Sequence, residues 1–560
     1  MVFEIIAYFL SAIAMMLIFF IPGFLSSLFF RRLDSVEKIT VSFFFSVSWI
    51  IIIFIAYHYA GFEASPAVLI PLSVLSLILF VFVRKQVFGF RMSKEVKLLL
   101  LLFFIIFMAK ITAQIFIKYY PAGSDYVGHY KTALYFLGNE WKLPDSYINP
   151  DNPEVYIPYR TPGFYMPISF FMSIFGSSFW VCQIAATLLN TVFIFPTYCI
   201  AKKFFSKKIA LLTIVFLTII PFVETSLYIH AKMLVAYFAF LMFYLFTARK
   251  LSPFIIGSVA GLGLMIHQSF FIFVLAMATP YLFDLVKKRS KSELIFALKI
   301  AFAFSLVILP WFAINYLKYG TPLSSDYAYF PLYTTNYGAG NYSPLELWDN
   351  FKKTSPLYIV GARVINTVTF ATPAILVSKI AALFFPFTLD TGKTNPPVPV
   401  NFASGRDLPW AYHYYHSLPG ILTMLMYVFA VIGFIKLWGY NKKLFYFVLI
   451  PIIFTIIWYG WVVLVIIRSG VPEVIPIFVI IGFWEISKRK DREKMVKLVF
   501  LLAIIELVIF SIFFSWHIGI AEQIAIERKG DPKYLVDIDQ LEKLFSAYKL
   551  FKVQEMGKWL

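Results

Sequence analysis

Runs of apolar residues follow one another along almost the whole chain. Most of them are about 17 to 25 residues long, the length of a helix that spans a bilayer. Composition agrees, because 60% of the 560 residues are hydrophobic and only 14% are charged. A soluble domain could not bury so much apolar surface, so the soluble classes are excluded. The pattern predicts an all-α polytopic membrane protein with about 14 transmembrane helices. We expect the spans near residues 5–29, 39–60, 66–83, 98–118, 178–200, 208–228, 232–248, 253–267, 269–285, 296–316, 417–437, 443–461, 464–486 and 497–516.

Lysine and arginine residues indicate the orientation of these spans. More than half of the 49 basic residues fall in short loops on one side of the predicted membrane. Cytoplasmic loops carry an excess of Lys and Arg, so this side is expected to be cytoplasmic and both termini to lie outside. The formal charge of +19 therefore follows from topology and does not indicate a nucleic-acid partner. The basic loops contain Arg31, Arg32 and Lys38; Arg84, Lys85, Arg91, Lys94 and Lys97; Lys202, Lys203, Lys207 and Lys208; Arg249 and Lys250; Lys287, Lys288, Arg289, Lys291 and Lys299; Lys436, Lys442 and Lys443; and Lys488, Arg489, Lys490, Arg492, Lys494 and Lys497.

The predicted topology divides the chain into N-terminal transmembrane hairpins, a main transmembrane domain with two long outer loops, and a small outer helical tail. An apolar stretch near 366–388 would break the alternation of the later loops if it crossed the membrane. We therefore expect a re-entrant or surface-lying helix there. The parts are residues 1–97, residues 98–516 with outer loops at 119–177 and 317–416, and residues 517–560.

The cysteines and the N-terminal segment add two further expectations. Cys182 and Cys199 lie in one apolar segment without a CxxC spacing, so we expect neither a structural disulfide nor a cysteine metal site. The first 30 residues lack a basic start and form a run too long for a cleaved leader, so they are expected to be the first span.

The first long outer loop opens with a polar segment at residues 123–130. Within it Asp125 precedes His129 by four residues, so on a helix the two side chains share one face. A carboxylate that aromatic residues partly shield can act as a general base on a hydroxyl group, although a lone carboxylate beyond a span is often only solvated. A second acid in the same loop, Glu154, favours a functional role. We predict Asp125 and His129 as the catalytic candidates.

Arg468 is the second candidate, because it interrupts an apolar run near the outer end of a span. A charge at mid-span costs roughly 2.5–3.5 kcal/mol and less near the interface, so this cation needs a partner. It either snorkels to lipid headgroups, pairs with Glu473, or binds a phosphate through its planar guanidinium.

Other polar residues converge on the same outer face. Lys232 lies in a short outer hairpin with Glu224, and His267 interrupts a long apolar hairpin. Arg160 either joins the site or holds its loop through a salt bridge. All seven histidines fall at or near the outer face, which the shortness of the inner loops explains as well as outer chemistry does.

The order of these elements resembles the GT-C superfamily of membrane glycosyltransferases, in particular the branch of protein O-mannosyltransferases and aminoarabinose transferases. The similarity covers residues 98–486. It rests on an acidic residue after a span and on five short motifs that follow. The matching residues are Asp125; Arg160-Thr161-Pro162-Gly163-Phe164-Tyr165; Phe175-Gly176; residues 201–208; Leu309-Pro310-Trp311 through Tyr319-Gly320-Thr321-Pro322; and Arg468 with Pro472.

The chain also departs from the pattern of that branch. A second carboxylate beside Asp125 is absent, and the frequent TKG turn reads Ile266-His267-Gln268. These changes argue against protein mannosylation and aminoarabinose transfer as the specific activity. Four spans precede the first outer loop, where one is usual, which suggests an added pair of hairpins at the N-terminus.

The resemblance implies a GT-C-like fold and an activity. The enzyme would transfer a monosaccharide from a dolichyl- or undecaprenyl-type phosphate donor to an outer hydroxyl of a glycan, lipid or protein, with inversion, as a multi-pass protein of the plasma membrane. Asp125 would be the base, with His129 beside it. The lipid phosphate would be held by Arg468, Lys232 and His267, and the substrate loops would contribute Arg160, Glu154, Glu224 and Tyr165. No cofactor is required by this scheme, and the sequence leaves the need for a divalent metal open.

Nucleotide-sugar donors are disfavoured, because the cytosolic loops are too short for a nucleotide-binding domain and contain no GxGxxG motif. Two alternatives stay open. A transporter or lipid flippase would show inverted repeats and charges near mid-membrane, neither of which is clear here. An O-antigen-ligase-like transferase would use the 317–416 loop, so that substitution of Arg406, His413 and His416 would abolish its activity. An interfacial aromatic belt explains the two histidines equally well.

The orientation can be tested by thiol labelling after Cys182 and Cys199 have been changed to Ala. Single cysteines at Ser206 and Ser290 should be shielded from an impermeant reagent in sealed right-side-out vesicles, whereas cysteines at Ser124 and Ser343 should react. Labelling at Ser206 would reverse the predicted orientation.

Overall fold

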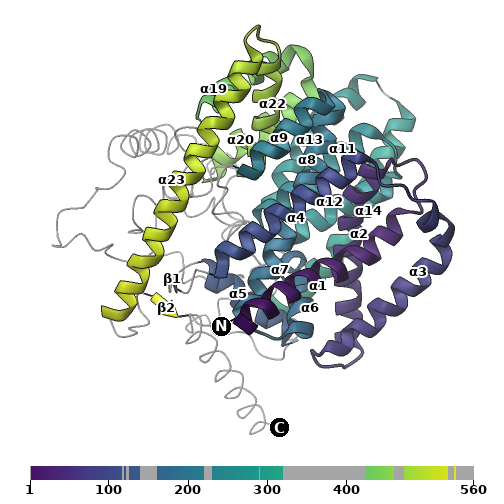
Figure 1. Cartoon of the computed structure of the whole chain (residues 1–560). Coiled ribbons are helices and arrows are strands. Elements are labelled where there is room, and N and C mark those ends of the chain that lie inside the picture. Colours follow the sequence, from purple (N-terminus) through teal and green to yellow (C-terminus); the bar gives the residue numbers. More distant parts are fainter. Residues whose placement is uncertain are drawn as a thin grey trace.

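The computed structural model describes residues 2–115, 119–121, 125–138, 161–219, 230–288, 290–319, 424–459, 472–527 and 535–537. These residues form a bundle of α-helices with one pair of three-residue strands (Figure 1). Among them, seven helices are long and apolar enough to cross a membrane, and five more are apolar but shorter. The prediction of an all-α polytopic membrane protein is confirmed.

The N-terminal hairpins are joined by a capped turn. Asp34 accepts a hydrogen bond from the backbone of Glu37, while the Glu37 carboxylate accepts one from the Asp34 backbone, and this capping box begins the second helix. Of these helices α2 lies innermost, because it contacts α6, α8 and α11. The hairpin elements are α1 (Val2–Ser27), α2 (Ser35–Tyr59), η1 (Pro66–Val68), α3 (Leu69–Gly89) and α4 (Lys94–Ile115).

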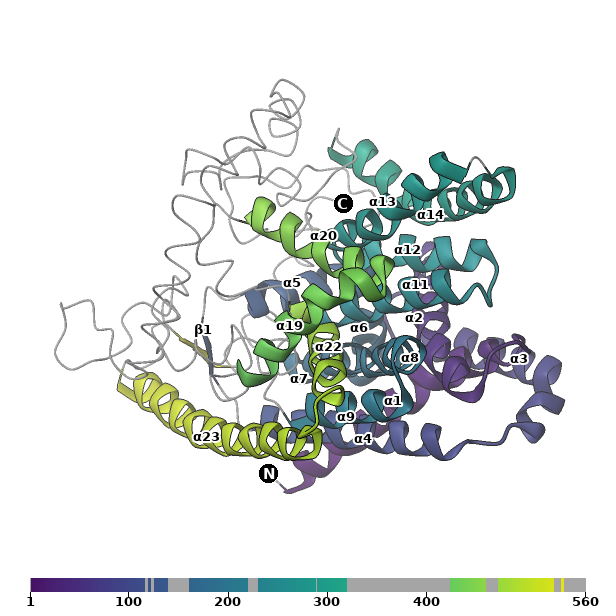
Figure 2. The same ribbon diagram turned by 90° about the horizontal axis from the view of Figure 1, so that it is seen from above.

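The main bundle follows, and Figure 2 shows α3 and α23 at opposite edges of it. Its elements are β1 (Tyr119–Pro121), α5 (Asp125–Leu137), α6 (Pro162–Phe175), α7 (Phe179–Thr191), α8 (Ile194–Phe204), α9 (Lys207–Ile219), α11 (Lys232–Ala248), α12 (Pro253–Ile266), α13 (Phe270–Lys288), α14 (Lys291–Tyr319), α19 (Met424–Tyr440), α20 (Lys442–Tyr459), η8 (Pro472–Val474), α22 (Ile475–Ser487), α23 (Arg492–Glu527) and β2 (Leu535–Asp537).

Every predicted span overlaps an α-helix, but some boundaries differ. The span expected at 178–200 is divided into α7 and α8. In the span expected at 464–486, the described residues are the 3-10 turn η8 and the helix α22, which starts at Ile475. The expected helix at 366–388 lies outside the described residues.

Two segments differ from expectation in kind. Within the expected outer loop 119–177, α6 is a buried apolar helix that packs against α2, α5, α7 and α12. The tail is predicted to be helical. At Leu535–Asp537 it instead forms the strand β2, which pairs antiparallel with β1. That pairing satisfies the backbone groups of both short segments.

Close backbone contact fixes the most extensive helix pair, α12 with α14. A Cβ atom on Gly257 would lie 2.2 Å from the carbonyl oxygen of Ile300, and one on Gly261 would lie 2.8 Å from the Cβ of Val307. Small residues four apart permit this approach of two helices, as in other membrane bundles.

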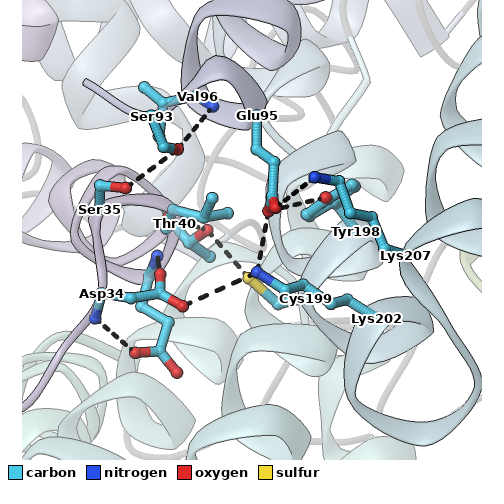
Figure 3. A network of polar contacts seen from close by, with 12 residues as sticks. Asp34, Ser35, Thr40, Ser93, Glu95, Val96, Tyr198, Cys199, Lys202 and Lys207 are labelled. Carbon is cyan, nitrogen blue, oxygen red and sulfur yellow. Dashed lines mark hydrogen bonds and ion pairs between the residues drawn. The ribbon is translucent and has the colours of Figure 1, made fainter.

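Ion pairs connect the inner ends of the helices (Figure 3). The Glu95 carboxylate of α4 accepts hydrogen bonds from Lys202 Nζ at 2.8 Å and from the Tyr198 hydroxyl at 3.0 Å, and its other oxygen lies 2.7 Å from Lys207 Nζ. Glu37 of α2 is buried and pairs with Lys250 Nζ at 2.6 Å. Both contacts link the N-terminal hairpins to the main bundle. Cys199 lies in the same region, and it and Cys182 are free thiols.

Substitution Glu95→Gln should destabilise the chain by about 1–3 kcal/mol, because it leaves two lysines without their partly buried anionic partner. The thermal midpoint in detergent should fall. Glu63→Gln, at an exposed position, is the matched control and should leave the midpoint unchanged. Equal midpoints for both variants would show that the Glu95 contacts do not contribute to stability.

Candidate functional site

The candidate site lies where α5, α6, α11 and η8 meet, and α5 and α6 lie at the end of the bundle that carries the N-terminus (Figure 1). The 17 residues of α11 separate Lys232 from the inner loop at Arg249. At 1.5 Å per residue this is about 26 Å along the helix, close to the thickness of the hydrocarbon core. The site is therefore at the opposite end of α11 from the basic loop that contains Arg249 and Lys250.

Histidine 129 is the centre of a buried aromatic cluster. Its Nδ1 atom lies 2.5 Å from the hydroxyl oxygen of Tyr165 on α6, and the two rings are nearly parallel. Its ring centroid lies 5.2 Å from that of His230. Pro162 at the first turn of α6 sets the start of that helix, which places Tyr165 on the face toward α5.

Backbone contacts hold His230 in place. The amide of Asn190 in α7 donates to the carbonyl oxygen of His230, and its side-chain oxygen accepts from the Leu234 backbone at 3.1 Å. The backbone N–H of Lys232 donates to Nδ1 of His230 at 3.3 Å. Nδ1 of His230 therefore acts as a hydrogen-bond acceptor in this arrangement, whereas Lys232 contributes an ammonium group.

The cation of the described site is therefore Lys232, in the first turn of α11. Glu473 of η8 is buried beside it. Burial raises the pKa of Glu473 above the ordinary carboxyl value, and the positive charge of Lys232 opposes that rise. A buried carboxylate and an adjacent ammonium group form a charge pair that an entering anion would perturb.

His267 joins this region through the first turn of α6. A Cβ atom on Gly163 would lie 2.7 Å from the carbonyl carbon of Met265, so α6 approaches the end of α12 backbone to backbone. His267 follows that end directly, and its Nδ1 accepts from the Ser269 backbone at 3.1 Å. Nδ1 thus accepts a backbone hydrogen bond in His267, as it does in His230.

The structure describes some of the predicted site residues but not others. It brings together His129, Tyr165 and Lys232, with His267 at the neighbouring helix end. Asp125 is the first residue of α5, one helical turn from His129, as the four-residue spacing requires. The remaining predicted residues lie outside the described segments; they are Glu154, Arg160, Glu224 and Arg468.

Three residues of the site were not among the predicted ones. Asn190 is an amide within an apolar span, a signal that could have identified it. In the sequence, His230 lies in the outer hairpin, where no residue spacing identifies a partner for it. Glu473 was considered only as a partner for Arg468, whereas its described charge partner is Lys232.

The described residues contain no group of three or more His, Cys, Asp or Glu side chains that could hold a metal ion. The described part of the site offers hydrogen-bonding groups of tyrosine and imidazole side chains, together with the Lys232 cation.

Part of the chain matches a known protein family. Residues 159–313, which include Tyr165, His230, Lys232 and His267, match the family described as "Dolichyl-phosphate-mannose-protein mannosyltransferase". The chain is thus similar to GT-C glycosyltransferases, as its motifs predicted, and the match supports the class of membrane glycosyltransferase. No curated protein matches the chain significantly.

The Tyr165–His129 contact can be tested with a pair of tyrosine variants. Tyr165→Phe removes the hydroxyl that contacts Nδ1 of His129, and Tyr130→Phe removes the hydroxyl that donates to the Ser177 carbonyl oxygen at 2.6 Å. Each should cost about 1 kcal/mol in stability. Only Tyr165→Phe should shift the Nδ1 resonance of labelled His129 in solid-state NMR. An unchanged resonance would mean that Tyr165 does not set the state of His129.

Proposed function

We propose that the protein transfers a monosaccharide from a polyprenyl-phosphate donor to an acceptor hydroxyl on the extracytoplasmic side of the plasma membrane, with inversion at the anomeric carbon. The description of the matching family names a dolichyl-phosphate-linked sugar, which supports a donor of this lipid class. The acceptor is a hydroxyl of a glycan, lipid or protein.

One observation supports the proposal most strongly. His129 from the Asp125 helix, Tyr165 from α6, and His230 with Lys232 from α11 meet at one place near the outer end of the bundle. A phosphate on a lipid anchor and a hydroxyl in the outer aqueous phase can both reach such a place. The cytosolic loops are too short for a nucleotide-binding domain, which disfavours a nucleotide-sugar donor.

In the proposed reaction Asp125 removes the proton of the acceptor hydroxyl as its oxygen attacks the anomeric carbon. The bond from that carbon to the phosphate oxygen breaks, and the lipid phosphate leaves with the electron pair. Its phosphate is already anionic, so it needs no proton from a general acid. His129, oriented by Tyr165, positions Asp125 or the acceptor.

The departing phosphate gains negative charge, which nearby cations stabilise. Lys232 is the described cation of the site, and Arg468 and His267 complete the proposed phosphate site. Arg160, Glu154 and Glu224 are proposed to shape the substrate loops. Arg468 suits this role because a guanidinium can donate two parallel hydrogen bonds to one phosphate.

The experiment compares the proposed base with the proposed phosphate ligand. Asp125→Asn keeps the shape of the side chain but removes its basicity, so transfer should fall by ~10²–10⁴-fold while donor affinity stays nearly constant. Arg468→Ala should instead weaken donor affinity, and Arg468→Lys should restore it only in part. Release of polyprenyl phosphate in nanodiscs measures transfer, and donor affinity is measured separately.

Near-normal turnover of Asp125→Asn would reject it as the base, and Glu154→Gln and Glu224→Gln would then be tested in the same assay. Equal donor affinity of wild type, Arg468→Ala and Arg468→Lys would reject the phosphate role of Arg468.

A further inference from the structure

Two sets of basic residues on the inner face differ in their partners. One group forms ion pairs with carboxylates of neighbouring helices. Its described members are Lys202, Lys207, Arg249, Lys250 and Lys436, whose partners are Asp34, Glu95, Glu293, Glu37 and Glu485. These pairs account for the cations that connect the bundle.

The second group lies around the inner ends of α1, α3 and α4. It consists of exposed cations for which the described part of the chain supplies no hydrogen bond or ion pair. Exposed apolar side chains lie among them in the sequence, with Phe88 82% and Met92 50% exposed. We call this group the basic–apolar patch, and define it as Arg31, Arg32, Arg84, Lys85, Arg91 and Lys94 with Phe29, Phe88 and Met92.

Contacts beneath the patch hold its segments together. Phe24 of α1 meets Phe90 after α3 at a ring-centroid distance of 5.1 Å. Leu28 and Val83 belong to a small separate apolar cluster between the same helices. The hydroxyl of Ser35 also donates to that of Ser93 at 3.2 Å. The loop after α1 and the turn between α3 and α4 therefore form one continuous surface.

Nearby acids do not neutralise this surface. Asp34 lies 3.9 Å from Lys202 Nζ, and Glu95 contacts both Lys202 and Lys207. Both carboxylates are thus engaged with cations of α8 and α9, which lie outside the patch. The six patch cations keep their charge without a described counter-ion.

We propose that the basic–apolar patch binds the headgroups of anionic phospholipids of the cytoplasmic leaflet. Clustered Lys and Arg residues just beyond a span attract anionic headgroups. The patch also continues onto a lipid-facing surface, because α3 lies at the edge of the bundle (Figure 2) and exposes Leu77, Val81 and Phe82. Phe88 and Met92 extend that apolar surface to the level of the charges. A lipid supplies both the phosphate and the acyl chains that this combination fits.

The test uses the whole protein, purified in detergent, stripped of lipid and titrated with phosphatidylglycerol or phosphatidylcholine under native mass spectrometry. Wild type should bind phosphatidylglycerol in preference. The triple variant Arg84→Gln, Lys85→Gln, Arg91→Gln should lose that preference by ~10–100-fold, since each basic residue near a membrane surface adds a comparable electrostatic increment. High salt should weaken the wild-type preference.

The matched control removes three exposed cations from another inner loop, as Lys490→Gln, Arg492→Gln, Lys494→Gln. That loop carries its own acids, Asp491 and Glu493, so the preference should change by less than about threefold. Thermal midpoints of both variants check that the fold is intact, since all six positions are exposed.

Equal losses in the two triple variants would show a general effect of charge and overturn the proposal. An unchanged preference in the patch variant would overturn it as well. Displacement of the lipid by inorganic phosphate at matched ionic strength would indicate a free-anion site and reject lipid as the occupant.

Discussion

The pairing of carboxylates with basic residues at the inner ends of the helices is the constraint on which the rest of the bundle depends. Hydrocarbon cannot solvate a carboxylate, so these carboxylates need basic partners. Glu37, Glu95 and Glu293 lie in the first turns of α2, α4 and α14, where the helix dipole favours a negative charge. Glu95 also pairs with Lys202 of α8, and Glu293 and Glu37 pair with Arg249 and Lys250 of the loop after α11. These contacts set the axial position of one helix against the next at the inner face. Because the helices are stiff, the same contacts determine where their outer ends meet.

The sequence predicted most of the bundle because the length of an apolar run is a local property. The span expected at 232–248 coincides with α11, since Lys232 and Arg249 bound an uninterrupted apolar run. The buried helix α6 lies in a segment that the sequence predicts to be an outer loop, because its 14 residues are too few to cross a bilayer alone and include two prolines. Its burial follows from packing on α2 and α12, which no local pattern reveals. The strand at 535–537 also depends on a distant partner, β1.

The candidate site shows the same division between local and tertiary information. The four-residue spacing of Asp125 and His129 predicted their shared helix, because one turn of helix is a local geometry. The contact of His129 with Tyr165 joins residues 36 positions apart, and its ring contact with His230 joins residues on separate helices. The role of Asn190 likewise appears only when α7 and α11 are side by side. Sequence patterns therefore identified the polar residues, and packing selected their partners.

The charges of the site follow a different rule from those of the inner face. The paired cations Lys202, Lys250 and Lys436 meet carboxylates at 2.6 to 2.8 Å and help to hold the bundle together. Lys232 instead occupies the first turn of α11, where the helix dipole disfavours a cation, and the carboxyl of Glu473 is buried nearby. His230 and His267 accept backbone hydrogen bonds through Nδ1. In the proposed reaction the negative charge of the lipid phosphate compensates the unfavourable interaction between the Lys232 cation and the helix dipole. Lys232 then interacts most strongly with the phosphate when the negative charge of the phosphate has increased. This is the condition for stabilising the leaving group during transfer.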